Sequence, residues 1–132
     1  MEVTVDASVV LAVILNEPSK AQLLEVTGDV DLVAAPTLPW EVGNALSALF
    51  KRARLSLLQA KSAVDSFERI ALRLADVDLL AAVELAEKHR IYAYDAYVLE
   101  CARRYRTPLL SLDGPQREVG RRMGLEIVQL ET

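Results

Sequence analysis

Four acidic residues have the types and positions needed for metal-assisted chemistry. Asp6 directly follows the β-branched run VTV, and Asp113 directly follows the run LLSL. Glu41 and Asp95 lie near the starts of two predicted helices. In open parallel α/β sheets, ligands bind outside the carboxyl ends of the strands, where the loops converge. We therefore expect all four carboxylates at one rim of the molecule.

Carboxylates gathered in one crevice repel one another, and this repulsion raises their pKa values unless a cation lies between them. The chain has a single cysteine, Cys101, and a single histidine, His89, which excludes a thiolate zinc site and a multi-histidine centre. Oxygen ligands alone favour Mg²⁺ or Mn²⁺, ions that complete their coordination with water and phosphate oxygens. The pattern therefore indicates hydrolysis of a phosphate ester.

Each of these acids also has a simpler explanation. Asp95 and Asp113 both precede predicted helices, so either could be an N-cap worth about 1 kcal/mol. Glu41 could be an acid that the helix dipole favours in a first turn. These explanations are stronger for each acid taken singly, but four acids at one rim are harder to explain by independent capping.

The composition is that of a globular domain. The chain has 132 residues, of which 52% are hydrophobic and 26% are charged, and we expect residues 1–132 to form a single domain. Its formal net charge of −4 predicts no overall attraction to nucleic acid or anionic membranes. The chain has 19 acidic and 15 basic residues, so without the four candidate carboxylates the counts are equal. The acidic excess therefore matches the proposed pocket.

The chain shows no targeting or membrane-spanning signal. Its first residues include Glu2 and Asp6 instead of a basic region, and the apolar run from Val9 to Leu15 lacks a cleavage site. The apolar stretches all fall short of the ~18 residues that a membrane-spanning helix needs. We therefore expect a soluble, cytoplasmic protein.

Strand-like and helix-like segments alternate along the chain. We expect strands at 3–5, 31–35, 108–112 and 125–130, a further alternating segment at 70–74, and helices at 9–15, 20–26, 37–54, 56–67, 79–88, 95–104 and 114–123. Ser56 and Asp76 are the expected caps of two of these helices. Strands separated by helices need crossover connections, which predicts a three-layer α/β/α fold with a mostly parallel sheet of four or five strands.

These features resemble the PIN-domain family, and within it the small VapC-type toxins of type II toxin–antitoxin systems. The likeness covers nearly the whole chain. It rests on VTVDASVVLAVIL around Asp6, PTLPWEVGNAL around Glu41, IYAYDAYVLECARRY around Asp95 and PLLSLDG around Asp113. The resemblance implies a PIN-like fold.

It also implies a Mg²⁺- or Mn²⁺-dependent endoribonuclease toxin. In such an enzyme Asp6, Glu41, Asp95 and Asp113 would form the catalytic, metal-binding pocket, in which the metal activates a water molecule that attacks the phosphodiester. Ser8 matches a small hydroxyl residue of the family and would hydrogen-bond an acid or a substrate phosphate. An RNA substrate, a cognate antitoxin and a homodimer are the partners that the resemblance implies.

Asn44 and several basic residues are further candidates. Asn44 lies one helical turn after Glu41, so it either orients that carboxylate or is an ordinary polar residue on a helix flank. Basic residues form three clusters, which either track RNA phosphates or serve the C-termini of helices: Lys51, Arg52 and Arg54; Arg103, Arg104 and Arg106; and Arg117, Arg121 and Arg122. Arg117 and Arg121 share a helical face next to Asp113 and are the best candidates for RNA contact.

The aromatic residues favour packing over base stacking. Tyr92, Tyr94, Tyr97 and Tyr105 surround Asp95, and rings of this kind are more often half-buried than available to bases. Trp40 is either a core anchor or part of an interface groove. The helical pair over 37–67 has more apolar positions than one layer buries. The remaining apolar side chains would pack in the core, in a homodimer interface or against an amphipathic antitoxin helix.

Other classes fit less well. A phosphoreceiver domain needs a second acid beside Asp6 and a lysine after the late strand, and this chain has no lysine after Lys88. A haloacid-dehalogenase-type phosphatase needs an acid where Ser8 stands. The remaining alternatives are a PIN-like housekeeping nuclease and a non-catalytic module that binds RNA or protein.

Overall fold

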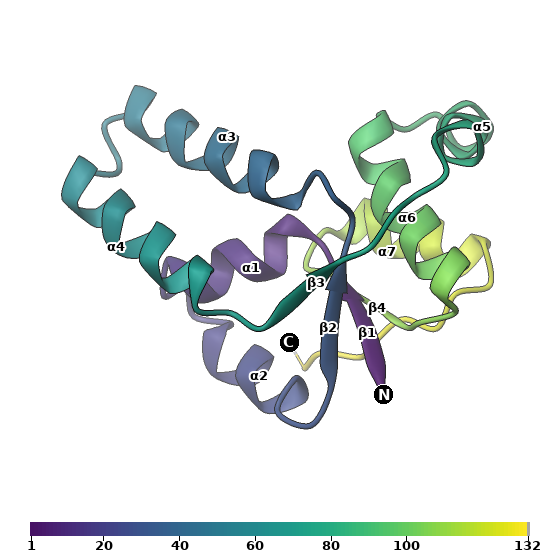
Figure 1. Ribbon diagram of the computed structural model, residues 1–132, viewed down its shortest axis with the longest axis horizontal. Helices are drawn as coiled ribbons and strands as arrows, with labels where there is room; N and C mark the ends of the chain where they lie inside the picture. Colours follow the sequence, from purple (N-terminus) through teal and green to yellow (C-terminus); the bar gives the residue numbers. More distant parts are fainter. Residues whose placement is uncertain (132) are drawn as a thin grey trace.

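The structure, a computed structural model, describes residues 1–131. Within them a four-stranded sheet has the order β3-β2-β1-β4, and all neighbouring strands are parallel (Figure 1). The strands are β1 (Glu2–Val5), β2 (Asp31–Ala34), β3 (Leu72–Leu74) and β4 (Leu109–Leu110). The helices are α1 (Ala7–Ile14), α2 (Lys20–Val26), α3 (Leu38–Lys51), α4 (Leu57–Glu68), α5 (Leu79–His89), α6 (Ala93–Tyr105) and α7 (Gly114–Arg122).

Helices cover both faces of the sheet, and the central strand β1 is buried on both sides. In β1, Val3 and Val5 are buried against a cluster that includes residues of α1 to α4. Thr4, between them, is also buried and points to the opposite face, toward Cys101 of α6. Burial on both faces is typical of parallel sheets. The predicted three-layer α/β/α fold with a parallel sheet is therefore confirmed.

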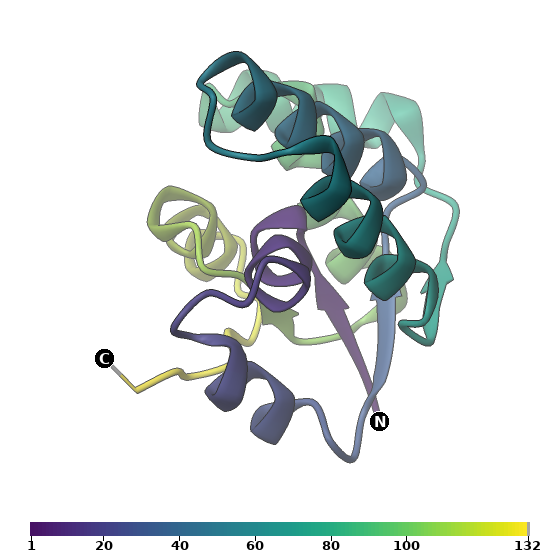
Figure 2. The ribbon, with the colours of Figure 1, turned by 90° about the vertical axis from the view of Figure 1, so that its left-hand side faces the viewer.

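Helices α3 and α4 form a hairpin that extends beyond the sheet (Figure 2). Ser56 starts α4 with a capping box: its Oγ accepts from the backbone of Gln59, and the Gln59 side chain accepts from the backbone of Ser56. The expected cap at Ser56 is confirmed. The hairpin packs onto the domain mainly through α1, which contacts both of its helices.

Two expectations about local structure are wrong. The helix over 79–89 is capped by Asp78, whose carboxylate accepts from the backbone of Ala81, and Asp76 instead offers its carbonyl to Arg104 and Tyr105. The expected strand at 125–130 is only an isolated bridge between Leu109 and Ile127. Its partner β4 is two residues long, which leaves little backbone for a longer ladder. Within residues 1–131, no helix is both long and apolar enough to cross a membrane.

Candidate active site

The candidate site lies where the connections of the sheet change direction. The chain passes from β1 to β2 and β3 on one side, and then returns to place β4 on the other side of β1. Val5 pairs with Leu110, so the ends of β1 and β4 are level. Crevices between strand ends at such a switch point are the usual ligand sites of α/β sheets. Asp6 and Asp113 follow these two strands and therefore border the crevice.

Asp6 is held by donors from two segments. Ser8 Oγ donates to Asp6 Oδ1 at 2.5 Å, and Ser111 Oγ donates to Asp6 Oδ2 at 2.7 Å. The backbone N–H of Val9 also donates to Oδ1, at 3.3 Å, so that Asp6 caps α1. The Asp6 side chain is buried and has both carboxylate oxygens engaged. Its position is therefore fixed by hydrogen bonds.

Ser111 is a site residue that the sequence reasoning missed. Besides its bond to Asp6, its Oγ accepts from the backbone N–H of Asp113 at 3.0 Å. Ser8 Oγ similarly accepts from the backbone N–H of Leu112 at 3.0 Å. The two hydroxyls thus join the ends of β1 and β4. A serine within the apolar run LLSL was the available signal, because a buried hydroxyl needs a partner.

Asp113 is the N-cap of α7, since its Oδ1 accepts from the backbone N–H of Gln116 at 3.1 Å. Asp113 is therefore an N-cap, as the simpler explanation expected, and capping occupies its Oδ1. The capping explanation is wrong for Asp95, because Tyr92 occupies the N-cap position of α6 and Asp95 lies within the first turn. Asp95 and Asp113 are both half-buried.

Glu41 lies in the first turn of α3 and is half-buried. Thr37, one turn earlier, donates from Oγ1 to Glu41 Oε2 at 3.1 Å. Asn44 does not orient Glu41: within residues 1–131 it is exposed, and its side chain makes no hydrogen bond to Glu41. Thr37 takes the role instead.

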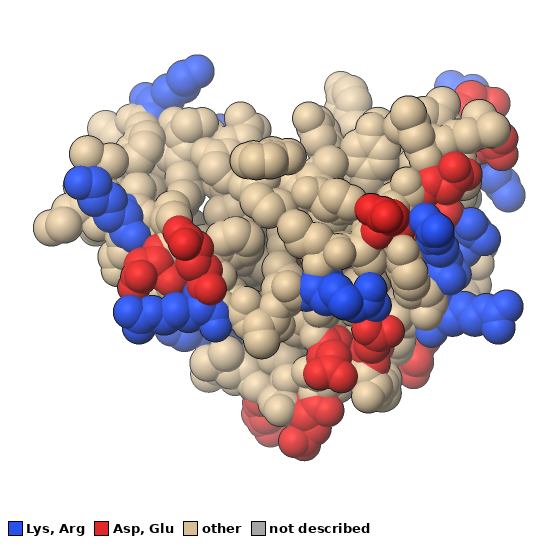
Figure 3. Space-filling model, in the orientation of Figure 1, with Lys and Arg blue, Asp and Glu red and all other residues tan. Residues whose placement is uncertain are grey.

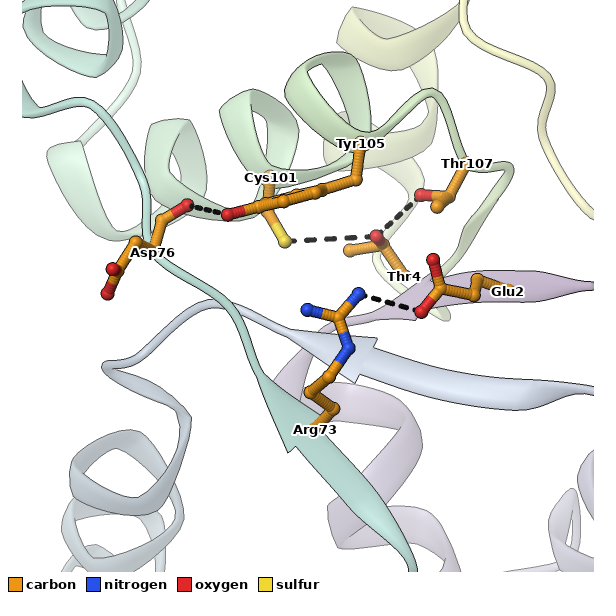
Figure 4. A network of polar contacts seen from close by, with 7 residues as sticks. All are labelled: Glu2, Thr4, Arg73, Asp76, Cys101, Tyr105 and Thr107. Atoms are coloured by element: carbon orange, nitrogen blue, oxygen red, sulfur yellow. Dashed lines mark hydrogen bonds and ion pairs between the residues drawn. The ribbon is translucent and has the colours of Figure 1, made fainter.

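A network of polar contacts fixes α6, the helix that carries Asp95, against the sheet (Figure 4). Thr4 of β1 shares a hydrogen bond of 2.6 Å with Thr107, just after α6, and its hydroxyl lies 3.9 Å from Cys101 Sγ. At the same end of α6, Tyr105 donates to the carbonyl of Asp76 at 2.7 Å. These contacts orient α6, so they set the position of Asp95 relative to Asp6.

The four carboxylates act on one another electrostatically. Burial raises the pKa of Asp6, against the lowering effect of the bonds from Ser8 and Ser111, and the charge of Asp113 adds to the rise. Burial raises the pKa of Glu41 to about 7, and the charges of Asp6 and Asp95 contribute. The pKa of Asp95 is raised by burial and by the charges of Asp113 and Asp6. The fold has therefore brought all four predicted acids into one electrostatic cluster.

The family model for the PIN domain matches residues 3–122. The chain belongs to the PIN-domain family. PIN domains are generally nucleases that use divalent metal ions. The matched region contains all four acids of the cluster.

Solved structures support the fold of this PIN domain. PAE2754 from Pyrobaculum aerophilum has a TM-score of 0.71 and 18% identity, with 90% of this chain and 79% of that chain covered. VapBC2 from Rickettsia felis, solved with a DNA fragment from its promoter, has a TM-score of 0.69 and 15% identity. That match covers 97% of this chain and 98% of the other. No curated protein matches this chain.

The donor set of this PIN domain fits a hard divalent cation. Its four acids offer only oxygen atoms; burial is the main reason that the pKa values of Asp6, Glu41 and Asp95 are raised, and the charges of neighbouring acids add to the rise. Among residues 1–131, no three Asp, Glu, His or Cys side chains are close enough together to enclose an ion directly. Ions such as Mg²⁺ are commonly held by one or two carboxylates and several waters, so they do not need three protein ligands in direct contact.

Two other candidates lie on α7. Arg117 is half-buried, and within the described chain its Nε is buried without a hydrogen-bond partner. Arg121 pairs with Glu118 at 3.7 Å on the surface. The buried Nε of Arg117 is not itself accessible to a ligand, whereas the guanidinium of Arg121 is exposed and its ion pair is weak.

A pocket of about 570 Å³ adjoins Glu41 in this PIN domain. It lies between α1, α3 and the first turn of α6, and its lining is Ala7, Leu11, Trp40, Glu41, Asn44, Ala45 and Tyr94. In Figure 3 the upper edge of the molecule dips between the α3–α4 arm and the α5–α6 arm, and the surface there is mainly uncharged. A ligand that fills this pocket would contact the acidic cluster through Glu41.

Proposed function

We propose that this protein is a Mg²⁺- or Mn²⁺-dependent endoribonuclease that acts as the toxin of a VapC-type toxin–antitoxin pair. The observation that carries the proposal is the electrostatic coupling of Asp6, Glu41, Asp95 and Asp113 at the switch point of the sheet. Such a cluster of carboxylates is unfavourable unless a cation neutralises it. Because PIN domains are generally nucleases, the reaction that the cation would assist is hydrolysis of a phosphodiester.

In this proposal Asp6, Glu41, Asp95 and Asp113 hold the ion, directly or through water. When bound, the ion lowers the pKa of a water molecule and stabilises the negative charge that develops on the phosphate. Hydrogen bonds from the hydroxyls of Ser8 and Ser111 favour the charged carboxylate of Asp6 and oppose the rise in its pKa that burial causes.

Without a cation, burial and the charges of Asp6 and Asp95 raise the pKa of Glu41 to about 7. A bound cation would lower that pKa and keep the carboxylate charged, so Glu41 serves as a ligand or orients the attacking water. Thr37 holds Oε2 of Glu41 by a hydrogen bond. Arg117 and Arg121, which follow Asp113 on α7, bind phosphates of the RNA.

The toxin assignment rests on VapC-type likeness and on the α3–α4 hairpin. A second pocket, of about 430 Å³, lies between these helices and is lined largely by apolar side chains such as Leu46, Phe50 and Leu57. An amphipathic helix of a cognate antitoxin would fit such a groove. VapBC2 of Rickettsia felis is a toxin–antitoxin complex, and its matched chain has a similar fold. We also propose that residues 1–132 form a single domain, that the protein is a homodimer and that it is located in the cytoplasm.

Cleavage assays test the nuclease. Purified protein should cut single-stranded RNA with Mg²⁺ or Mn²⁺ and stop in EDTA, and Asp6→Asn and Asp95→Asn should each lose at least 100-fold in rate. Asp29→Asn is the matched control, because Asp29 is exposed between α2 and β2. Cleavage that persists in EDTA, or in both site variants, would rule out the proposed metal nuclease.

Induced expression in bacteria tests the toxin assignment separately. Growth should stop with the wild-type protein and continue with Asp6→Asn. Harmless expression of a protein that is active in vitro would instead indicate a housekeeping nuclease.

A further inference from the structure

Three aromatic residues near the acidic cluster are exposed, contrary to expectation. Trp40 is 76% exposed, Tyr94 is 57% exposed and Tyr92 is 86% exposed. The core-anchor interpretation of Trp40 is therefore wrong, and so is the expectation of half-buried packing for Tyr92 and Tyr94. That expectation holds for Tyr97 and Tyr105. Exposed rings of this size cost free energy in water, which makes them candidates for ligand contact.

Two of these rings line the pocket beside Glu41. Trp40 directly precedes Glu41 on α3, and Tyr94 directly precedes Asp95 on α6. The pocket therefore has one aromatic ring from each of two helices, and one acid of the cluster, Glu41, lines it beside them. Tyr92, although more exposed, does not line it.

The Tyr94 ring is positioned before any ligand arrives. It packs edge-on against Tyr97, with 5.9 Å between ring centroids and 86° between ring planes. Tyr97 is half-buried one turn further along α6, the helix that the contacts in Figure 4 fix to the sheet. Rings that are already ordered bind a planar ligand with a smaller loss of entropy.

We propose that Trp40 and Tyr94 bind an unpaired nucleobase of the RNA, next to the phosphate that reaches the acidic cluster. This inference rests on the proposed nuclease function and names the substrate class as single-stranded RNA. Every base has a π face that stacks on an aromatic side chain, whereas a base inside a duplex has both faces covered. Asn44, in the same pocket, offers an amide that donates to and accepts from a base edge.

The position of the pocket favours RNA over a protein partner. Glu41 lines the same pocket as the two rings, so a ligand that contacts the rings also contacts this acid of the cluster. A helix of a protein partner would bind instead in the separate apolar groove between α3 and α4. The pocket beside Glu41 holds about 570 Å³, which is ample for one base and its ribose.

Trp40 is the single tryptophan of the chain, so its fluorescence reports on the pocket directly. Six-residue oligoadenylate is added in buffer with Ca²⁺, and gels check that the RNA stays intact. We expect saturable quenching of Trp40 emission. An abasic hexamer and a 12-base-pair RNA duplex should produce none, because they carry charge but no accessible base.

Variants separate stacking from charge. Tyr94→Ala should weaken oligoadenylate binding about tenfold, and Tyr92→Ala should leave it unchanged, since Tyr92 is exposed but outside the pocket. Equal quenching by the abasic hexamer, or equal affinity in Tyr94→Ala, would overturn the proposal. Absence of any quenching would also overturn it and assign the two rings to a protein contact.

Cleavage kinetics distinguish this inference from the nuclease itself. Trp40→Ala should raise KM for single-stranded RNA about tenfold with a smaller change in kcat, and Trp40→Phe should restore most of the loss. Wild-type kinetics in Trp40→Ala would refute stacking while the nuclease stands. Saturable quenching in a protein that cuts no RNA would leave base binding in place and refute the nuclease.

Discussion

Ser111 Oγ donates a hydrogen bond of 2.7 Å to Asp6 Oδ2, and this bond joins residues that are 105 positions apart in the chain. It connects the end of β4 to the end of β1, and the same hydroxyl accepts from the backbone of Asp113. The protonation state of Asp6 and the position of Asp113 thus depend on one small side chain.

Replacing this hydroxyl should shift the pH dependence of cleavage. Because the Ser111 bond lowers the pKa of Asp6, Ser111→Ala should move the acid limb of the pH–rate profile to higher pH. The loss of buried hydrogen bonds should also cost about 1–2 kcal/mol of stability. Ser62→Ala, at an exposed site on α4, is the control. An unchanged acid limb would show that Ser111 does not set the ionisation of Asp6.

Glu41 should make the fold less stable as the pH rises. Its pKa is raised from 4.5 to about 7, so the neutral form is favoured in the folded state. The stabilisation is full below pH 4.5 and is lost as the pH rises through 7. Glu41→Gln should therefore be more stable than the wild type at pH 8, by about 1–2 kcal/mol after allowing for solvent screening.

Urea unfolding at pH 5 and pH 8 measures this difference. Glu25→Gln, an exposed residue of α2, should show none. If Glu41→Gln has no greater advantage at pH 8 than at pH 5, Glu41 does not carry the raised pKa.

Divalent cations should stabilise the folded protein in the absence of RNA. An ion that binds only the folded state raises its stability by about 2.7 kcal/mol at 100 times its Kd. Mn²⁺ should therefore raise Tm in a concentration-dependent way, and Asp95→Asn should remove most of the rise. Asp29→Asn should keep it. Equal shifts in all three proteins would place the ion elsewhere.

An ion pair on α6 whose carboxylate is buried and whose arginine is half exposed should contribute more to stability than an exposed pair on α7. Glu100 is fully buried, and Arg103 donates to its two oxygens at 2.5 and 2.8 Å. Arg103→Ala would leave that buried carboxylate unpaired and should cost about 2–3 kcal/mol. Arg122→Ala, which removes a surface pair with Glu118 at 3.4 Å, should cost under about 1 kcal/mol. Thermal unfolding compares the two variants. Equal losses of stability would contradict the larger contribution of the Glu100–Arg103 pair.

The sequence was sufficient to predict the class of fold and the acids of the cluster. Alternation of short apolar runs with helical segments determines a parallel sheet, because each crossover needs a helix. The ends of the strands follow from where those runs stop, and this placed Asp6 and Asp113 at one rim. These inferences depend on local patterns alone.

The hydrogen bonds and the exposed rings could not be predicted in this way. The Ser111 bond depends on β4 pairing with β1 in a particular register, and no local pattern determines that register. The choice of Thr37 over Asn44 as the partner of Glu41 depends on side-chain orientations within one turn. The exposure of Trp40 depends on which neighbours α3 lacks, and helical periodicity does not reveal missing neighbours.

The strand order β3-β2-β1-β4 has a consequence for synthesis on the ribosome. Asp6 is synthesised 105 residues before Ser111, which directly follows β4, and Asp113 comes two residues later still. A nascent chain that stops before these residues has neither the hydroxyl that supports Asp6 nor the fourth acid. The strand order therefore delays assembly of the site until β4 and the residues after it have left the ribosome.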